Sequence, residues 1–150
     1  MKWVTRSRLH VDRVACPWLI RRFVDSRAEF IFAPKSAVLA VAEAEEALAF
    51  DSPGAPLGHV GELCTFDAII ARYGLTDPAL LLLARIVRAA DTDRLADHPA
   101  AAGLEAIAKG FGLVHPDDAE NLARQWVVYD ALYAWCRLEV AAGRGPEGQA

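Results

Sequence analysis

The 150 residues of this chain suit one domain, and its 54% hydrophobic and 24% charged residues exclude intrinsic disorder. Ten glycines and eight prolines are too few for a collagen-like or low-complexity chain. The net charge of -4 is uneven, because residues 1–27 hold seven Lys or Arg against two Asp, whereas the remainder holds nine against eighteen Asp or Glu. The basic segment is therefore expected to face an anion or, as is commoner, to pair with the acidic remainder.

No segment of the sequence is typical of a membrane span or an export signal. The most apolar stretch, residues 78–90, is interrupted by two arginines and is shorter than the roughly 20 residues that cross a bilayer. The first ten residues are basic and precede no apolar run, which predicts no signal peptide. The three cysteines are odd in number and lack CxxC spacing, so no disulfide framework is expected. We expect a cytoplasmic protein without a membrane partner.

The N-terminal half of the chain predicts short strands alternating with helices. Alternating residues predict a strand over 3–12, and Pro17 is expected to open a helix over 17–25. The segment 29–33 predicts a second strand that ends at Pro34. Ser36 is expected to cap a helix running to residue 47, followed by a strand over 48–51 and an ordered loop over 52–62.

The C-terminal half predicts four helices. The expected helices are residues 65–73, capped by Thr65; a central helix from Pro78, apolar nearly all round; a helix opened by His98-Pro99 and ended by Gly110 or Gly112; and a long helix over 117–140. The fold prediction is a single α+β domain over residues 1–142, mainly helical, with a small sheet in the N-terminal half and a long C-terminal helix. Residues 143–150 are expected to be a disordered tail.

The last long helix carries a one-sided apolar stripe, which bears on partners. Its members are spaced by three and four residues from Leu122 to Val140. Core packing is the expected role, because the stripe is too short to demand a partner helix. A homodimer stays open as an alternative.

The first predicted strand carries an unusual polar face. Arg6, Arg8, His10 and Asp12 share one side of the predicted strand, and Arg13 follows. Guanidinium groups offer paired planar donors that suit an oxyanion, so Arg6, Arg8 and Arg13 form a candidate anion-binding site. The alternative is a surface strand whose arginines meet the acidic remainder of the chain.

A candidate metal site centres on His59, which stands between two glycines before a helix start. We place His10, His59, Glu62 and Asp91 in this site, because imidazole and carboxylate groups coordinate divalent metals. Asp91 lies at the C-terminal end of the buried helix, where a carboxylate opposes the helix dipole and needs compensation. The alternative is ordinary polar pairing, with Arg88 compensating Asp91.

Cys16 is a candidate reactive thiol. It precedes the expected helix start at Pro17 and lies close to Arg13, and both a helix N-terminus and a cation lower a thiol pKa. The commoner alternative is a small buried core residue.

Four segments together carry a family resemblance: residues 5–25 (TRSRLHVDRVACPWLIRRFVD), 48–70, 79–93 and 128–137. They resemble the chromate-resistance ChrB-type C-terminal domain, most specifically through HVDRVACPWLIRRF. The resemblance implies a bacterial cytoplasmic domain associated with chromate resistance, found behind a regulatory N-terminal region or beside a rhodanese-like sulfurtransferase. The 150 residues contain neither companion, so direct nucleic-acid binding by this chain is not expected.

These observations support two functional interpretations. The first is an accessory module of chromate resistance that binds or senses a small inorganic ligand, either an anion or a metal ion. The second is a small metal-dependent enzyme with a site around His59, Glu62 and Asp91. A divalent metal ion is the one cofactor that these residues suggest, and the alternative is that there is none. Nucleotide-binding and hydrolase interpretations lack support, because the motifs GxGxxG, GxxxxGK[ST], GxSxG and HExxH are absent.

Overall fold

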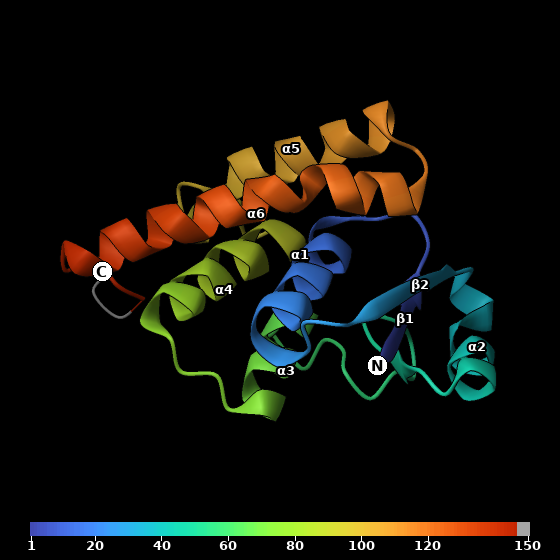
Figure 1. The fold of residues 1–150 in the computed structure, drawn as a ribbon. Coiled ribbons are helices and arrows are strands. Elements are labelled where there is room, and N and C mark those ends of the chain that lie inside the picture. Colours follow the sequence, from blue (N-terminus) through green and yellow to red (C-terminus); the bar gives the residue numbers. More distant parts are fainter. Residues whose placement is uncertain (147–150) are drawn as a thin grey trace.

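The computed structural model describes residues 1–146, which form an α+β fold as predicted (Figure 1). The strands are β1 (Lys2–Arg6), β2 (Glu29–Ala33) and β3 (Leu48–Ala49). The helices are α1 (Val11–Leu19), continued by a π-helical turn (Ile20–Val24), α2 (Val38–Glu45), α3 (Thr65–Tyr73), α4 (Pro78–Asp91), α5 (Ala101–Val114) and α6 (Asp118–Ala141). Short 3-10 turns span Lys35–Ala37 and Leu95–Asp97. The small N-terminal-half sheet and the long C-terminal helix are both confirmed.

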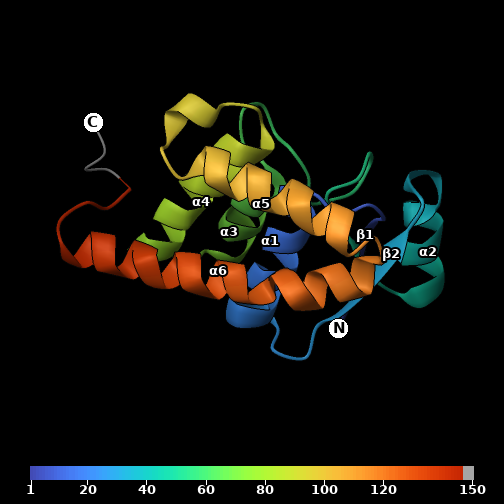
Figure 2. The ribbon, with the colours of Figure 1, turned by 90° about the horizontal axis from the view of Figure 1, so that it is seen from above.

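The sheet is parallel, with strand order β2-β1-β3. Side chains alternate across β1, so Trp3 packs into the main core with α1 whereas Val4 packs against Val38 of α2. The two helices therefore cover opposite faces of the sheet (Figure 2). The chain leaves β1 toward β2 and then crosses back to β3, so the connections reverse direction beside β1. In parallel sheets such a reversal opens a crevice at the carboxyl ends of the strands, where ligands bind.

The helical layer is built around α4. Its Leu80, Leu82, Leu83 and Ile86 are fully buried, which confirms the predicted central helix. Helices α5 and α6 lie side by side over it (Figures 1 and 2). Leu122, Tyr129 and Cys136 of the α6 stripe are buried, and Trp126, Tyr133 and Val140 pack against the same core. The stripe therefore serves core packing, as expected.

The predicted strand over 3–12 is too long, and the helix predicted over 17–25 begins too late. Strand β1 ends at Arg6 because its partner β2 ends at Ala33, just before Pro34, and the Ser7 amide makes the last bond to the Ala33 carbonyl. Helix α1 begins at Val11 and contains Pro17 in its interior. Buried side chains at residues 11, 14, 15, 18 and 19 follow the helical period, which prevails over the short alternating pattern.

Helix ends account for the smaller differences. Neither Ser36 nor Thr65 occupies the predicted cap position, because α2 is preceded by Ala37 and α3 by Cys64. Helix α5 continues through Gly110 and Gly112 to Val114, and β3 stops at Ala49. Of the predicted tail, the Arg144 amide donates to the Glu139 carbonyl, and residues 147–150 lie outside the described residues.

His98 bonds the residue just before α5 from a buried position. Its Nδ1 accepts the Ala100 amide at 3.0 Å, which requires that nitrogen to be unprotonated. Burial and the nearby Arg85 lower the pKa of this imidazole.

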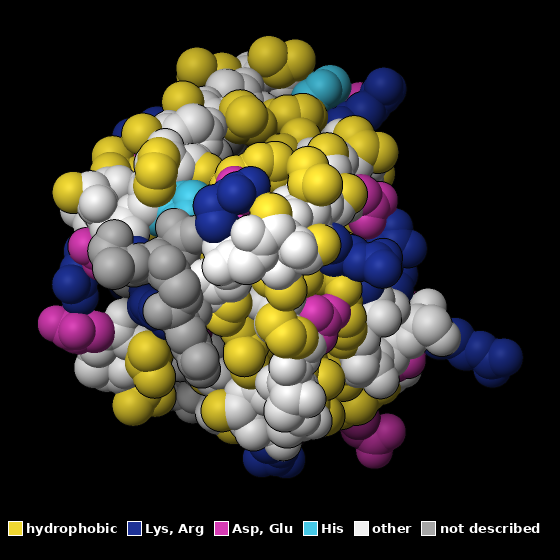
Figure 3. Space-filling model, turned by 90° about the vertical axis from the view of Figure 1, so that its left-hand side faces the viewer, with side chains coloured by type: hydrophobic (Ala, Val, Ile, Leu, Met, Phe, Trp, Pro, Cys, Tyr) yellow, Lys and Arg dark blue, Asp and Glu magenta, His cyan; other side chains and the backbone are white. Residues whose placement is uncertain are grey.

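The end of the molecule opposite the sheet mixes hydrophobic and charged side chains (Figure 3). Within residues 1–146, no helix combines the length and apolarity needed to cross a membrane.

Candidate metal centre

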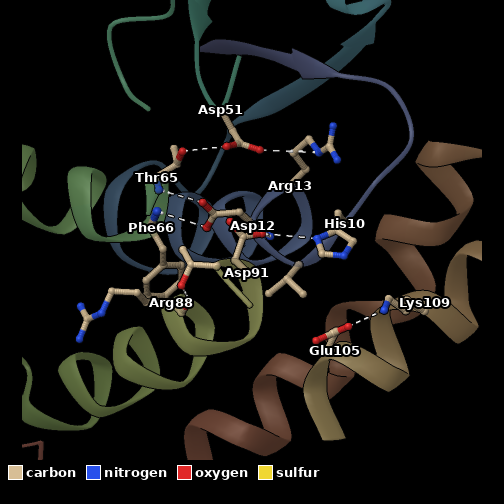
Figure 4. A network of polar contacts seen from close by, with 12 residues as sticks. His10, Asp12, Arg13, Asp51, Thr65, Phe66, Arg88, Asp91, Glu105 and Lys109 are labelled. Atoms are coloured by element: carbon tan, nitrogen blue, oxygen red, sulfur yellow. Dashed lines mark hydrogen bonds and ion pairs between the residues drawn. The ribbon is translucent and has the colours of Figure 1, made fainter. Parts of the chain in front are cut away.

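The candidate site lies at the crevice beside β1, where five segments converge. Figure 4 shows four of them: the N-terminal end of α1 with Asp12, Asp51 two residues after β3, the first turn of α3, and Asp91, the last residue of α4. The fifth is the loop that carries His59. The site thus combines chain positions separated by up to 79 residues.

Asp12 is the deepest group of the site. Its carboxylate accepts the backbone N–H groups of Thr65 at 2.8 Å and Phe66 at 3.3 Å, and also the Cys16 thiol at 3.4 Å. Asp12 therefore caps α3 from outside the helix, and the positive end of the helix dipole favours its charge. Burial, together with the charges of Asp91 and Asp51, nevertheless raises the pKa of Asp12 to about 6.

Asp91 plays the matching role for α1. Its Oδ1 accepts the Asp12 backbone N–H at 3.2 Å and lies 3.5 Å from His10 Nδ1. The compensation proposed for Asp91 from Arg88 is absent, because Arg88 pairs with Asp67 at 2.8 Å instead. His10 and His59 contact the Asp91 carboxylate instead.

His59 lies at the centre of three carboxylates. Its Nε2 is 3.1 Å from Asp91, 3.4 Å from Asp12 and 3.5 Å from Asp51. Its hydrogen bond with Asp12, reinforced by the other two charges, raises the pKa of the imidazole to about 9. The protonated ring therefore acts as a cation among the three acids.

Asp51 links this centre to the basic residues. Its carboxylate accepts the Thr65 hydroxyl at 2.9 Å and lies 3.7 Å from an Arg6 guanidinium nitrogen and 3.6 Å from Arg13. Asp51 has a φ of 46°, in the left-handed region that aspartate tolerates better than most residues.

The geometry suits a metal ion. Asp12, His59 and Asp91 each offer one ligand atom, and these atoms all lie within 4.8 Å of one another. Two carboxylate oxygens and one imidazole nitrogen are typical ligands of Mn²⁺, Fe²⁺ or Zn²⁺. Three protein ligands leave further coordination positions for water or another ligand.

The structure brings together three of the four predicted metal residues. His59 and Asp91 contact directly, and His10 supports Asp91. Glu62 lies outside the cluster, with an 83% exposed side chain that pairs with Arg94. Asp12 joins the cluster where Glu62 was predicted. The strand predicted over 3–12 places Asp12 on the same face as the candidate anion-binding arginines, so Asp12 was not predicted as a metal ligand. The signal was the helical spacing of Val11, Val14 and Ala15, which makes the intervening Asp12 part of a buried first helical turn.

Cys16 lies inside α1 rather than before a helix. It is fully buried beside Asp12, and burial together with the neighbouring carboxylates raises the pKa of this thiol. These surroundings act in the opposite direction to the one expected from a helix N-terminus and Arg13. Cys16 serves the site as a donor to Asp12.

The three predicted anion-binding arginines lie together. Arg6, Arg8 and Arg13 line one hollow, which they share with Lys35. Arg6 and Arg13 also contact Asp51, so part of the expected internal pairing occurs.

The match to a family model decides the relationship of the chain. Residues 3–136 match the model described as "ChrB, C-terminal domain". The chain belongs to the ChrB C-terminal domain family. The resemblance to the chromate-resistance ChrB-type domain is thereby confirmed, and the matched region of this ChrB C-terminal domain contains every residue of the candidate site.

A curated relative supports the same assignment. The ChrB C-terminal domain is 35% identical over 133 residues to the protein named Protein ChrB of Cupriavidus metallidurans. The match covers 88% of this chain but 40% of that relative, so the chain spans less than half of the relative's length. No solved structure matches the domain.

Proposed function

We propose that this ChrB C-terminal domain binds one divalent metal ion through Asp12, His59 and Asp91. The observation that carries the proposal is the position of His59 Nε2, within 3.5 Å of carboxylate oxygens from three separate segments. A single N–H group can bond well to one acceptor and cannot satisfy three. A metal ion can, because it binds several oxygen ligands at once.

The energetics of the carboxylates point the same way. The side chains of Asp12, Asp51 and Asp91 are at most 9% exposed, and gathering like charges away from water is unfavourable unless positive charge compensates. Arg6 and Arg13 face Asp51 and leave Asp12 and Asp91 to the histidines. A divalent ion in place of the His59 proton would supply two positive charges to this pair where the proton supplies one.

The proposed role is that of a cytoplasmic accessory module of chromate resistance that binds or senses a small inorganic ligand through this metal. Membership of the ChrB family supports this setting. The second candidate is a small metal-dependent enzyme. It is favoured by one feature, the three-ligand set, because catalytic metal sites keep a position open for a reacting molecule. In this version Asp12 replaces Glu62 in the site predicted from sequence.

Calorimetric titration of the purified, untagged chain with Mn²⁺ or Zn²⁺ tests the proposal. We expect one ion per chain, and we expect His59→Ala and Asp91→Asn each to weaken binding about tenfold or more. Glu62→Gln is the matched control, because it removes a nearby carboxylate that lies outside the cluster. Equal losses in Glu62→Gln, or retained affinity in His59→Ala, would contradict the site.

The two roles are separated by a further titration. If the domain is a binding module, small oxyanions will bind to the metal-loaded chain without being changed. If it is an enzyme, a small-molecule panel will yield a product whose formation requires the metal and stops in Asp91→Asn.

A further inference from the structure

A basic hollow includes Arg6 and Arg13, the two arginines that contact Asp51. It has a volume of about 440 Å³ and is lined by Arg6, Ser7, Arg8, Arg13, Pro34 and Lys35. The lining comes from two segments only, the end of β1 with the start of α1 and the residues after β2. Four of its six residues carry a positive charge.

The positive charge of this hollow is only partly compensated. The Asp51 carboxylate lies 3.7 Å from Arg6 and 3.6 Å from Arg13, whereas the Asp118 carboxylate accepts the backbone amide of Arg8. Within residues 1–146, neither the Arg8 guanidinium nor the Lys35 ammonium is paired with a carboxylate. Outside the metal cluster, four cationic groups therefore meet two carboxylates, which leaves an excess of two positive charges.

Arg13, the least exposed of the four cations, shows the excess of positive charge most clearly. The Arg13 side chain is 15% exposed, whereas that of Arg6 is 28% exposed. Guanidinium groups repel one another, and here one carboxylate serves two of them, because the same Asp51 oxygen lies 3.7 Å from Arg6 and 3.6 Å from Arg13. One of the two positive charges at the edge of the hollow is therefore left without a carboxylate of its own.

The backbone of Arg8 is held in an unfavourable conformation. Its φ of 65° is in the left-handed region, which costs a non-glycine residue about 1 kcal/mol or more. Both oxygens of Asp118 accept the Arg8 amide at 3.1 Å and keep it there. This conformation sets the Arg8 side chain at the hollow, and such strain is typical of residues retained for binding.

We infer that this hollow binds a small tetrahedral oxyanion carrying two negative charges, through Arg6, Arg8, Arg13 and Lys35. The charge excess of two matches a dianion, and the arginines can each donate paired N–H bonds to its oxygens. Because the hollow is larger than one such ion, the oxyanion could be free or could be the phosphate group of a phosphomonoester.

Asp51 connects the hollow to the metal cluster, and this part of the inference rests on the proposed function. A metal ion bound by Asp12, His59 and Asp91 would attract the Asp51 carboxylate, which lies 3.5 Å from His59 Nε2. The arginines would then lose part of their internal partner and bind an external anion more tightly. By linkage, the anion would raise metal affinity by the same factor.

Titration calorimetry with sodium sulfate, against sodium chloride at matched ionic strength, tests the anion site directly. We expect saturable sulfate binding by the full chain and no comparable chloride heat. Arg13→Gln should weaken it at least tenfold, and so should Arg8→Gly. Arg8→Gly also relieves the backbone strain, so it should melt no lower than the parent without sulfate. Arg27→Gln, an exposed arginine elsewhere, is the control.

The outcomes separate the two proposals. Sulfate binding that is absent in the parent, or lost equally in Arg27→Gln, would overturn the anion site whatever the metal does. Sulfate binding that survives in Arg8→Gly and Arg13→Gln would overturn it as well. Sulfate binding by a chain that binds neither Mn²⁺ nor Zn²⁺ would overturn the metal centre and leave the anion site standing. If the chain binds both ions, tighter sulfate binding in the presence of Mn²⁺ supports the link through Asp51, and an unchanged sulfate affinity refutes it.

A comparison of glycerol phosphate with inorganic phosphate separates the two sources of the oxyanion. Tighter binding of glycerol phosphate would identify a phosphomonoester as the ligand, and equal or weaker binding would identify a free oxyanion.

Discussion

Metal binding by this domain should depend steeply on pH, because the metal and a proton compete for His59. The pKa of His59 is raised from 6.5 to about 9 by its contacts with the three carboxylates. At pH 7 only about one ring in a hundred is then neutral, and only the neutral ring can coordinate a metal through Nε2. The apparent affinity at pH 7 is thus about a hundredfold below its limiting value.

The sign and slope follow from the same pKa. Affinity for Mn²⁺ should rise about tenfold for each pH unit between 7 and 8.5 and level off near pH 9. Below pH 6 the slope should approach two, because Asp12, with a pKa raised to about 6, takes up a second proton. At pH 7.5, binding of one ion should release about one proton.

Calorimetry in buffers of different ionisation enthalpy measures both the affinity and the protons released. Glu62→Gln should reproduce the parent slope, and His59→Ala should bind weakly with little dependence on pH above 7. Affinity that stays constant from pH 6.5 to 8.5, with no proton released, would refute the role of His59 as a ligand.

Three further predictions concern the fold that holds the site. Leu83→Ala should lower the free energy of unfolding by about 2–5 kcal/mol in urea titrations, whereas Leu113→Ala, at an 85% exposed position, should stay within about 0.5 kcal/mol. Tyr129→Phe removes the buried hydroxyl that donates to the Val11 carbonyl at 3.2 Å, and it should cost about 1 kcal/mol, visible as a melting point a few degrees lower. Because the pKa of His98 is lowered in the folded protein, the stability that this group contributes is present above pH 6.5 and is lost as the pH falls below it. An equal fall in melting point with falling pH in His98→Gln would contradict this.

The helical half of the fold was predictable from local patterns. The Asp77-Pro78 start of α4 and the Asp117 start of α6 are fully encoded in short motifs, and the structure shows Asp77 accepting the Ala79 amide and Asp117 the Glu120 amide. The apolar character of α4 also implied its central place. Such features need no knowledge of distant residues.

The N-terminal segment was harder, because two patterns overlap in it. Residues 3–12 alternate as a strand would, yet the strand can extend only as far as its partner β2, which ends at Ala33. Nothing in residues 3–12 themselves reveals that limit. A strand that continues to residue 12 places Asp12 on the face of Arg6 and Arg8 instead of at a helix start.

The candidate site was predicted in part for the same reason. Its histidine and the acid at the end of α4 were identifiable from glycine flanks and an unfavourable dipole. Asp51 was not, because it looks like an ordinary turn residue and gains its role from Thr65, Arg6 and Arg13 in three dimensions. Contacts between distant segments of this kind have no local signature.

The cap that Asp12 places on α3 makes two amides sensitive to the state of the site. The Thr65 and Phe66 N–H groups are bonded to the same carboxylate that is proposed to bind the metal. A metal ion on that carboxylate would polarise both bonds and restrain the first turn of α3, so the exchange of these two protons with solvent should slow when metal is added. With diamagnetic Zn²⁺, their resonances in a nuclear magnetic resonance spectrum of isotope-labelled protein would then record occupancy of the site without any substitution.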